Sequence, residues 1–511
     1  TLLASSAASD VYKRQMYDAG IRLLHVGINS ACPLPSVPTF CRWRSPSGND
    51  LLLVYQKDYG EDEVLPDGKT VVSINFTGDN HGPHSYERVK KIYADLRKRY
   101  PQAQLVGASF NDVARELLLI KKDLPVVTSE IGDTWIFGYG GAPIRMAKFR
   151  AVSRLYSQWL NEGKIKKDSD VALDFAAELG LIAEHTQGVD VKTHLRQWDK
   201  YDMDKFLKGR SEGVFSMAEA SWKEIDNYID SAIAFLPASL QKEAREVVAE
   251  VDKVKLEDNS KMKPMARKRW EQPIAGGMTL AGLSYQMFDG DDYDDFQNRY
   301  LRARYGWALD DLGKRGLKES HAVSVTLYAQ TMAQSVRKEK KGTRIITELR
   351  FPENEKVDKR VYPERIQVNC FTTKNGKRSE VALTIYGKPA VRLPESYWLS
   401  FTVPGIESVI AEKMGERVNL MDVVEKGNRQ MHGIDRYVDL ITSGETIRIS
   451  SKEAFLLNVG EAQGLNYSTN YPDKRKGVHF NLNNNLWGTN FSMWNEGSLT
   501  YHFVIETLSR K

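Results

Sequence analysis

The spacing of apolar residues divides this chain into three stretches of different character. Between residues 16 and 154, short apolar runs alternate with segments of helical periodicity, and the candidate strands are residues 22–28, 50–55, 71–76, 104–109 and 124–128. Strands that alternate with helices are typical of a parallel sheet with crossover connections. Because so few strands and helices make up only part of such a domain, we expect a partial parallel (β/α) barrel-like domain here.

The next two stretches have different periods. From residue 155 to 255, apolar residues recur at three- and four-residue spacing, which predicts an antiparallel helical bundle. Residues 256–270 are rich in lysine and indicate a linker. From residue 271 to 511, apolar and polar positions alternate between turn residues, which predicts an antiparallel β-sandwich. We therefore expect an α/β, α and β multidomain chain.

Composition narrows the classes of partner. A length of 511 residues exceeds what one hydrophobic core usually supports. The formal charge of +5 is small, and the basic residues are mixed with acidic ones, so we expect no nucleic-acid partner. No apolar run approaches the roughly 20 residues that cross a bilayer, so we expect no membrane span. The three cysteines have no CxxC spacing, which favours buried thiols.

The most informative motif is GDNHGPH at residues 78–84, which follows the apolar run 71–76. Asp79 could act as a general acid whose pKa is raised by burial, with Asn80 and His81 beside it. Alternatively, Asp79 and Asn80 only form an Asx turn, and the spacing alone favours this alternative. After Pro83, Ser85 is placed to cap an amphipathic helix.

A second polar cluster, residues 129–135, follows the apolar run 124–128 and contains Glu130, Asp133 and Trp135. Carboxylates can bind sugar hydroxyls or transfer protons, while an indole covers the C–H face of a pyranose. Equally, Asp133 could cap the next segment and Trp135 could be a core residue. The two interpretations are evenly balanced.

Two further features are weaker. His185 ends a helical run, and a lone histidine is more often structural than a metal ligand; His81, His84 and His194 are weak candidate partners. The amide run NLNNNLWGTN at residues 481–490 could line a carbohydrate edge or build tight turns beside a buried tryptophan, and turns are the simpler interpretation. The chain has no phosphate-binding glycine loop, HExxH or GxSxG motif.

Taken in order, these motifs resemble glycoside hydrolase family 38, the metal-dependent α-mannosidases, and more closely an uncharacterised bacterial and fungal branch. The resemblance rests on Trp43 with the turn at residues 47–49, on Gly78-Asp79, on Glu130 and on His185. At the level of the branch it extends to residues 421–429 and 486–491 and so spans nearly all of the chain.

The resemblance implies a retaining glycosidase that acts on an oligosaccharide or glycan with α-linked mannose or a similar sugar. It implies Asp79 as the acid/base residue. It implies one divalent metal ligand, His185, with zinc as the expected metal. The expected substrate contacts are Asn80, His81, Glu130, Asp133 and Trp135. Ser129 and Asn80-His81 depart from the family pattern, which has glycine at these places.

The resemblance also predicts that parts of the site are missing. The family's His-x-Asp metal pair and its nucleophilic aspartate would precede Met16, and residues 1–15 resemble a translated sequencing adapter. We therefore expect a non-native tail at residues 1–15 and an N-terminally truncated, inactive fragment of a glycosidase. The alternative is a non-catalytic carbohydrate-binding protein on the same fold. Assembly into a homo-oligomer and the cellular compartment stay open.

Overall fold

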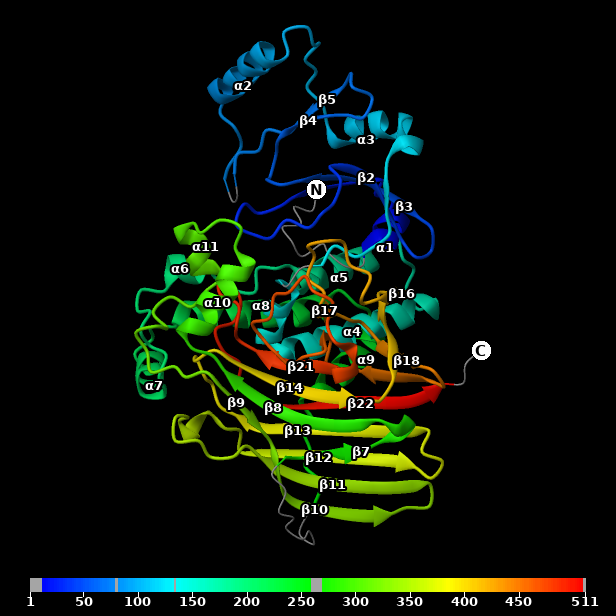
Figure 1. The fold of residues 1–511 in the computed structure, drawn as a ribbon, viewed down its shortest axis with the longest axis vertical. Coiled ribbons are helices and arrows are strands. Elements are labelled where there is room, and N and C mark those ends of the chain that lie inside the picture. Colours follow the sequence, from blue (N-terminus) through cyan, green and yellow to red (C-terminus); the bar gives the residue numbers. More distant parts are fainter. Residues whose placement is uncertain (1–11, 79–80, 133–134, 259–268, 509–511) are drawn as a thin grey trace. The chain divides into compact units, whose positions relative to one another are not determined.

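A computed structural model describes residues 12–78, 81–132, 135–258 and 269–508, whose contacts divide them into two compact units (Figure 1). Unit 1 comprises residues 12–78 and 81–132 together with Leu301–Ala303 and Asp422–Gly427. Unit 2 comprises the other described residues, at 135–258, 269–300, 304–421 and 428–508. Each unit is described by itself. The helical stretch and the C-terminal β stretch belong to unit 2, and the domain bounds expected from the sequence stay a prediction.

Unit 1 contains a small mixed sheet rather than a wholly parallel one. Its strands follow the order β1-β3-β2-β6, and only the β1–β3 and β2–β6 pairs are parallel. β2 and β3 are antiparallel because a tight turn joins them, in which Ser45 N donates to Asn49 O at 2.9 Å. The predicted partial barrel is therefore not confirmed. The strands are β1 (Leu23–Gly27), β2 (Phe40–Arg44), β3 (Asp50–Gln56) and β6 (Val126–Val127).

The predicted run 124–128 forms a strand only as β6 (Val126–Val127), and two other strands predicted for this unit are wrong in whole or in part. The run 71–76 forms a strand only as β5 (Val71–Ser73), which pairs antiparallel with β4 (Asp62–Val64), and Phe76 is exposed. The run 104–109 forms no strand. In both cases an apolar run lacks a neighbouring strand to supply hydrogen bonds along its length, so the pattern alone does not make it a strand.

The helices of unit 1 are α1 (Tyr12–Asp18), α2 (Tyr86–Arg99) and α3 (Phe110–Leu119). Ser85 caps α2 as predicted, since its side chain accepts a hydrogen bond from Arg88 N. Lys13 in α1 is buried. This burial gives no support to the expectation that residues 1–15 stand apart from the fold. The core of the unit is a cluster of apolar side chains, namely Phe40, Leu52, Val54, Leu65, Val72, Leu117 and Leu124.

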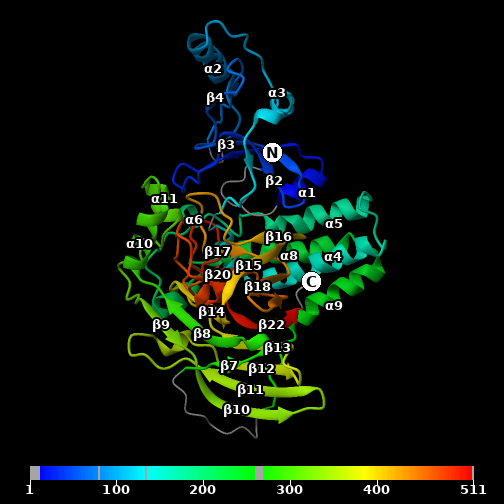
Figure 2. The same ribbon diagram turned by 45° about the vertical axis from the view of Figure 1, so that its right-hand side comes forward.

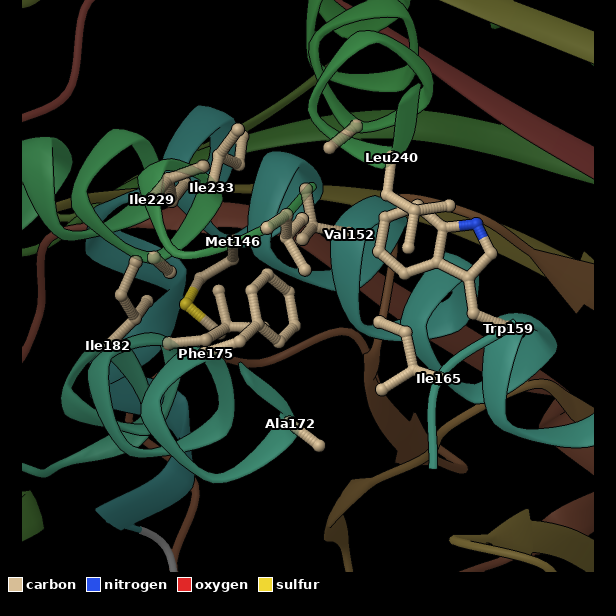
Figure 3. Packing of buried hydrophobic residues seen from close by; sticks show 14 residues of the cluster. Met146, Val152, Trp159, Ile165, Ala172, Phe175, Ile182, Ile229, Ile233 and Leu240 are labelled. Carbon is tan, nitrogen blue, oxygen red and sulfur yellow. The ribbon is translucent and has the colours of Figure 1, made fainter. Parts of the chain in front are cut away.

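The helical layer of unit 2 follows the predicted periodicity closely. The long helices lie side by side in Figure 2; α4 packs against α9, and α5 against α8. Their shared core is built around Phe175 and Trp159 (Figure 3). The helices of the unit are α4 (Pro143–Asn161), α5 (Asp170–Gly180), α6 (Val191–His194), α7 (Met203–Ser211), α8 (Ser216–Ala234), α9 (Ala238–Asp252), α10 (Gly290–Tyr300) and α11 (Gly306–Asp311).

The larger sheet of unit 2 is antiparallel throughout, with strand order β10-β11-β12-β13-β22-β19-β18-β15-β16 (Figure 1). Its strands are β10 (Gln330–Lys338), β11 (Gly342–Arg350), β12 (Arg365–Thr373), β13 (Arg378–Lys388), β15 (Ile406–Lys413), β16 (Glu416–Asn419), β18 (Tyr437–Thr442), β19 (Thr446–Ser451) and β22 (Gly497–Leu508).

A second antiparallel sheet has the order β17-β20-β21-β14-β8-β7, with β9 beside β8. The rings of Phe401 and Phe480 in this sheet lie 5.3 and 5.1 Å from Phe503 of β22, so the two sheets meet at an apolar layer. The predicted antiparallel C-terminal region is thus confirmed. The strands are β7 (Gln272–Pro273), β8 (Thr279–Met287), β9 (Val325–Tyr328), β14 (Glu395–Thr402), β17 (Met431–Gly433), β20 (Leu456–Val459) and β21 (Val478–Asn484).

Two further predictions can be compared with the structure. Cys32, Cys41 and Cys370 are all buried free thiols, as their spacing predicts. Across the described ranges, no helix combines the length and apolarity that a bilayer crossing requires.

Candidate functional site

The residues that the sequence singles out fall into three groups. Asp79, Asn80 and Asp133 lie outside the described residues. His81 is exposed in unit 1, and the neighbouring His84 Nε2 lies 2.9 Å from Asn75 O. The remaining three are Glu130 in unit 1 and Trp135 and His185 in unit 2.

Glu130 is held in a buried ion pair. Its Oε1 lies 3.3 Å from Lys13 Nζ, which also donates to Thr128 O at 3.0 Å and lies 4.7 Å from the Trp43 ring centroid. Its backbone N donates to Asp422 O at 2.9 Å, which joins two segments that are far apart in the chain. One carboxylate oxygen of Glu130 is thus committed to holding unit 1 together.

Trp135 opens a short 3-10 helix, η2 (Trp135–Gly141), that is rich in glycine. The glycines allow close packing: a Cβ on Gly138 would come within 2.4 Å of the Phe491 ring, and one on Gly140 within 2.3 Å of Asn484 Nδ2. Trp135 itself is buried, and its Nε1 donates to Tyr300 OH at 2.9 Å. The indole is therefore fixed in position by both packing and a hydrogen bond.

His185 lies beside this indole, in the loop that follows α5 and the turn at Leu181–Ala183. The two ring centroids are 6.2 Å apart with the planes 32° from one another, and the ring of Trp487 lies 6.1 Å from Trp135 on the same cluster. The structure thus brings together two residues that the sequence proposed separately. The His185 side chain is 40% exposed, so the pair combines a buried platform with a group that solvent and ligands can reach.

Glu184 contacts the His185 ring, although no sequence pattern assigned a role to this glutamate. Its carboxylate accepts a hydrogen bond from His185 Nδ1 and another from Thr186 N at 2.7 Å. Burial opposes ionisation of Glu184, but the hydrogen bonds from His185 and Thr186 prevail and lower the pKa of its carboxyl to about 2. The adjacency of glutamate and histidine in the sequence was the available signal.

The loop that carries these residues is anchored from behind. Arg145 Nη1 donates to Gln187 Oε1 at 3.0 Å, and Gln187 Nε2 donates to Ile182 O at 2.9 Å and to Glu184 O at 2.8 Å. Since Arg145 and Gln187 are both buried, these bonds hold the loop against α4.

This geometry determines what His185 can do. Because a carboxylate can only accept, Nδ1 of His185 carries the proton of that bond, which leaves Nε2 as the basic nitrogen of the neutral ring. A carboxylate-bound histidine of this kind can accept a proton or bind a metal. Within the described ranges, no three His, Cys, Asp or Glu side chains converge on a metal position. His185 thus fits one ligand position, and the expected zinc stays a prediction.

The amide run serves the interior instead of a carbohydrate edge. Asn485 Nδ2 donates to the carbonyls of Val391, Leu393 and Met493 at 2.9 to 3.0 Å, and Asn484 Nδ2 donates to Phe137 O at 2.9 Å. Both side chains are buried. The turn-building interpretation of this motif is therefore the one that the contacts support.

Two solved structures show similarity to nearly the whole of this chain. An α-mannosidase from Enterococcus faecalis V583 has a similar structure over 98% of this chain and 73% of its own, with a TM-score of 0.51 and 9% sequence identity. A glycosyl hydrolase family 38 protein from Enterococcus faecalis covers 98% of this chain and 71% of its own, with a TM-score of 0.43 and 10% identity.

Sequence comparisons add less. Residues 140–271 match the family described as "Domain of unknown function (DUF5054)". A search of curated protein sequences finds no match. At 9% identity, the structural likeness to the α-mannosidase establishes a glycoside-hydrolase-like fold.

Proposed function

We propose that this protein binds an α-linked mannoside or a similar sugar at a site that includes Trp135 and His185. The observation that carries the proposal is the tilted contact of these two rings, whose centroids lie 6.2 Å apart and which joins a buried indole to an exposed imidazole. The exposed imidazole can hydrogen-bond the hydroxyls of a pyranose, and the buried indole fixes the position of that imidazole. Because the fold is similar to that of an α-mannosidase, we propose a sugar as the ligand.

The residue roles in this proposal follow the chemistry of a retaining glycosidase. In a protein that holds both carboxylates of the pair, Asp79 would protonate the leaving oxygen and then take a proton from water, while the second carboxylate, unassigned in this chain, would attack the anomeric carbon. The resemblance to family 38 also makes Asn80, His81, Glu130 and Asp133 proposed substrate contacts of this activity.

A divalent metal, with zinc as the first choice, belongs to the same proposal. His185 Nε2 would supply one ligand, and Glu184 would orient the imidazole. Bound there, the metal would act as a Lewis acid that holds adjacent sugar hydroxyls. Removal of the Glu184 carboxylate is expected to weaken zinc binding by roughly 10- to 100-fold, the usual cost of losing such a partner.

Calorimetric titration with methyl α-D-mannoside, with and without Zn²⁺, tests the proposal. We expect His185→Ala to weaken sugar binding about tenfold or more. The matched control is His321→Ala, an exposed histidine that has no place in the proposed site, and it should leave binding unchanged. Equal affinity in the two variants would remove His185 from the site.

Turnover is measured separately, because binding without hydrolysis is what the carbohydrate-binding alternative predicts. We expect this chain to bind without hydrolysing an aryl α-mannoside, since only one carboxylate of the retaining pair is assigned in it. If a metal-dependent rate is measured, Asp79→Asn should abolish it and leave binding in place. A rate that survives Asp79→Asn would reject Asp79 as the acid/base residue.

A further inference from the structure

A second cleft lies in unit 2, between α4, α8 and the segment 492–496. Its volume is about 370 Å³, and its lining residues include Arg145 and Lys148 of α4 and Trp222, Asp226 and Asp230 of α8. Ligand sites for small molecules typically enclose about 300 to 1,000 Å³, so this cleft has room for one small ligand. Neither His185 nor Trp135 is among its lining residues.

One wall of the cleft is aromatic and rigid. The indoles of Trp222 and Trp494 meet edge to face, with centroids 4.7 Å apart at 81°. Trp494 is buried and held from behind by Phe206 and Phe215, whose centroids lie 4.9 and 5.2 Å from it. Trp222 is only half-buried, so its indole offers an apolar surface that is already fixed in place.

The rest of the lining is polar and rich in acceptors. Asp226, Asn227 and Asp230 lie along one side of α8, and their residues are exposed. Asn495 and Glu496 of the segment 492–496 also line the cleft. Nδ2 of Asn495 is buried without a hydrogen-bond partner among the described residues, so an acceptor on a ligand would satisfy it.

The cations of the lining, Arg145 and Lys148, are already paired with carboxylates. Arg145 Nε lies 2.6 Å from Asp226 Oδ1, and Lys148 Nζ lies 2.8 Å from Asp252 Oδ1. Glu496 in turn pairs with Arg210. A phosphate or carboxylate ligand would find no unpaired cation in this lining. A ligand with many hydroxyl donors and an apolar face suits the carboxylates, the amides and the indole together.

We propose that this cleft binds a neutral, hexose-sized sugar, with its hydroxyls on Asp226, Asn227 and Asp230 and its C–H face on Trp222. This site is separate from the Trp135–His185 site, and the inference does not rest on the proposed function. The cleft and the His185 loop share one wall: Arg145 bonds to Gln187, and a Cβ on Gly188 would lie 2.7 Å from Trp222 Nε1.

The shared wall decides which variants test the cleft. Asp226 is bonded to Arg145 and so supports the loop, whereas Asn227 is exposed and Asp230 Oδ1 lies 3.9 Å from Arg245 Nη1 of α9. We therefore choose the double variant Asn227→Ala/Asp230→Ala. Its matched control is Lys223→Ala/Glu224→Ala, which removes two exposed side chains of the same helix that do not line the cleft.

The measurement is a ligand-observed NMR titration of the full chain with methyl α-D-mannoside and methyl α-D-glucoside, made in the His185→Ala background. We expect residual sugar binding there that the cleft variant weakens about tenfold or more and the control variant leaves unchanged. Trp222→Phe, which keeps an aromatic ring in the wall, should weaken it by a smaller factor, and circular dichroism checks that each variant is folded.

Several outcomes would overturn the inference. One is the absence of sugar binding in the His185→Ala background, and another is residual binding that neither the cleft variant nor Trp222→Phe changes. A third is binding of tetramethylammonium or phosphate at the cleft without binding of either sugar. Failure of the proposed function gives a different result, since His185→Ala would then leave the total sugar binding of the wild-type chain unchanged.

Discussion

Glu184 and His185 show how a single neighbouring side chain changes what a residue can do. An isolated exposed imidazole can hydrogen-bond through either nitrogen, but the Glu184 carboxylate engages Nδ1 and so orients the ring. The hydrogen bonds that lower the pKa of Glu184 to about 2 keep the carboxylate charged at ordinary pH. The pair is therefore prepared for a ligand or a proton at Nε2.

A second histidine makes a residue-scale prediction about stability. His479 of β21 is buried, with Nδ1 2.8 Å from Ser400 Oγ, and burial lowers its pKa from 6.5 to about 4. Between pH 6.5 and pH 4, His479 binds a proton in the unfolded chain but stays neutral in the folded chain. The free energy of unfolding therefore decreases as the pH falls from 6.5 to 4. A difference of this size corresponds to about 3 kcal/mol.

Urea unfolding of unit 2 at pH 7 and at pH 4.5 measures this loss. His479→Gln should be less stable at pH 7 but should lose less stability on acidification, because glutamine does not titrate. The exposed His321→Gln serves as the control and should keep the wild-type pH dependence. An unchanged dependence in His479→Gln would show that His479 is not the group responsible.

At the scale of elements, α4 is tied to the strands of unit 2 by two arginines. Arg150 donates to the carbonyls of Lys452, Ile434 and Asp435, and Arg154 donates to the carbonyls of Lys452, Asp435 and Ser451. The guanidinium fork suits this task because it carries five donors in a fixed plane. The loops that end β17 and β19 thereby gain partners for their backbone groups.

We expect Arg150→Met to destabilise unit 2 by about 2 to 4 kcal/mol, since it leaves buried carbonyls without donors. Chemical denaturation followed by tryptophan fluorescence would measure this change. Arg245→Met, at an exposed position on α9, should change stability by no more than about 0.5 kcal/mol. A similar small effect at Arg150 would show that water replaces the guanidinium at no cost.

At the scale of the whole molecule, each unit has a core of its own. The helical core of unit 2 centres on Phe175, which is fully buried (Figure 3). Its ring lies 4.9 Å from that of Tyr156 and 6.3 Å from that of Trp159. The core of unit 1 is formed by other residues, among them Leu52 and Leu117. Stability should therefore be a property of each unit.

Phe175→Ala tests this separation. We expect it to cost about 3 to 5 kcal/mol in unit 2, through lost burial and the cavity that remains. Under native conditions, hydrogen exchange should become faster in peptides from α4 and α5 and should stay unchanged in peptides from β3. Faster exchange in β3 as well would mean that the two units open together.

Much of the local structure could be predicted from the chain, because local periodicity leaves a direct signature. The strand β3 coincides closely with its predicted run 50–55, and α2 begins after the predicted cap Ser85. The run 71–76 was misjudged because a strand also requires a partner, and its partner β4 offers only a short edge. An alternation of apolar and polar residues indicates that one face of a strand is buried, but it does not indicate how long the neighbouring strand is.

The candidate site divides along the same line. The sequence by itself determined which residues carry suitable chemistry, namely Trp135 and His185, and where most of the helices form, since helix formation depends on neighbours within a few positions. Only the tertiary structure decided that Trp135 bonds to Tyr300, that Glu130 is paired with Lys13, and that Asn485 serves the interior. These contacts join residues about 90 to 165 positions apart. Such pairs form only when the whole unit packs, and the local spacing of apolar residues in the sequence does not indicate them.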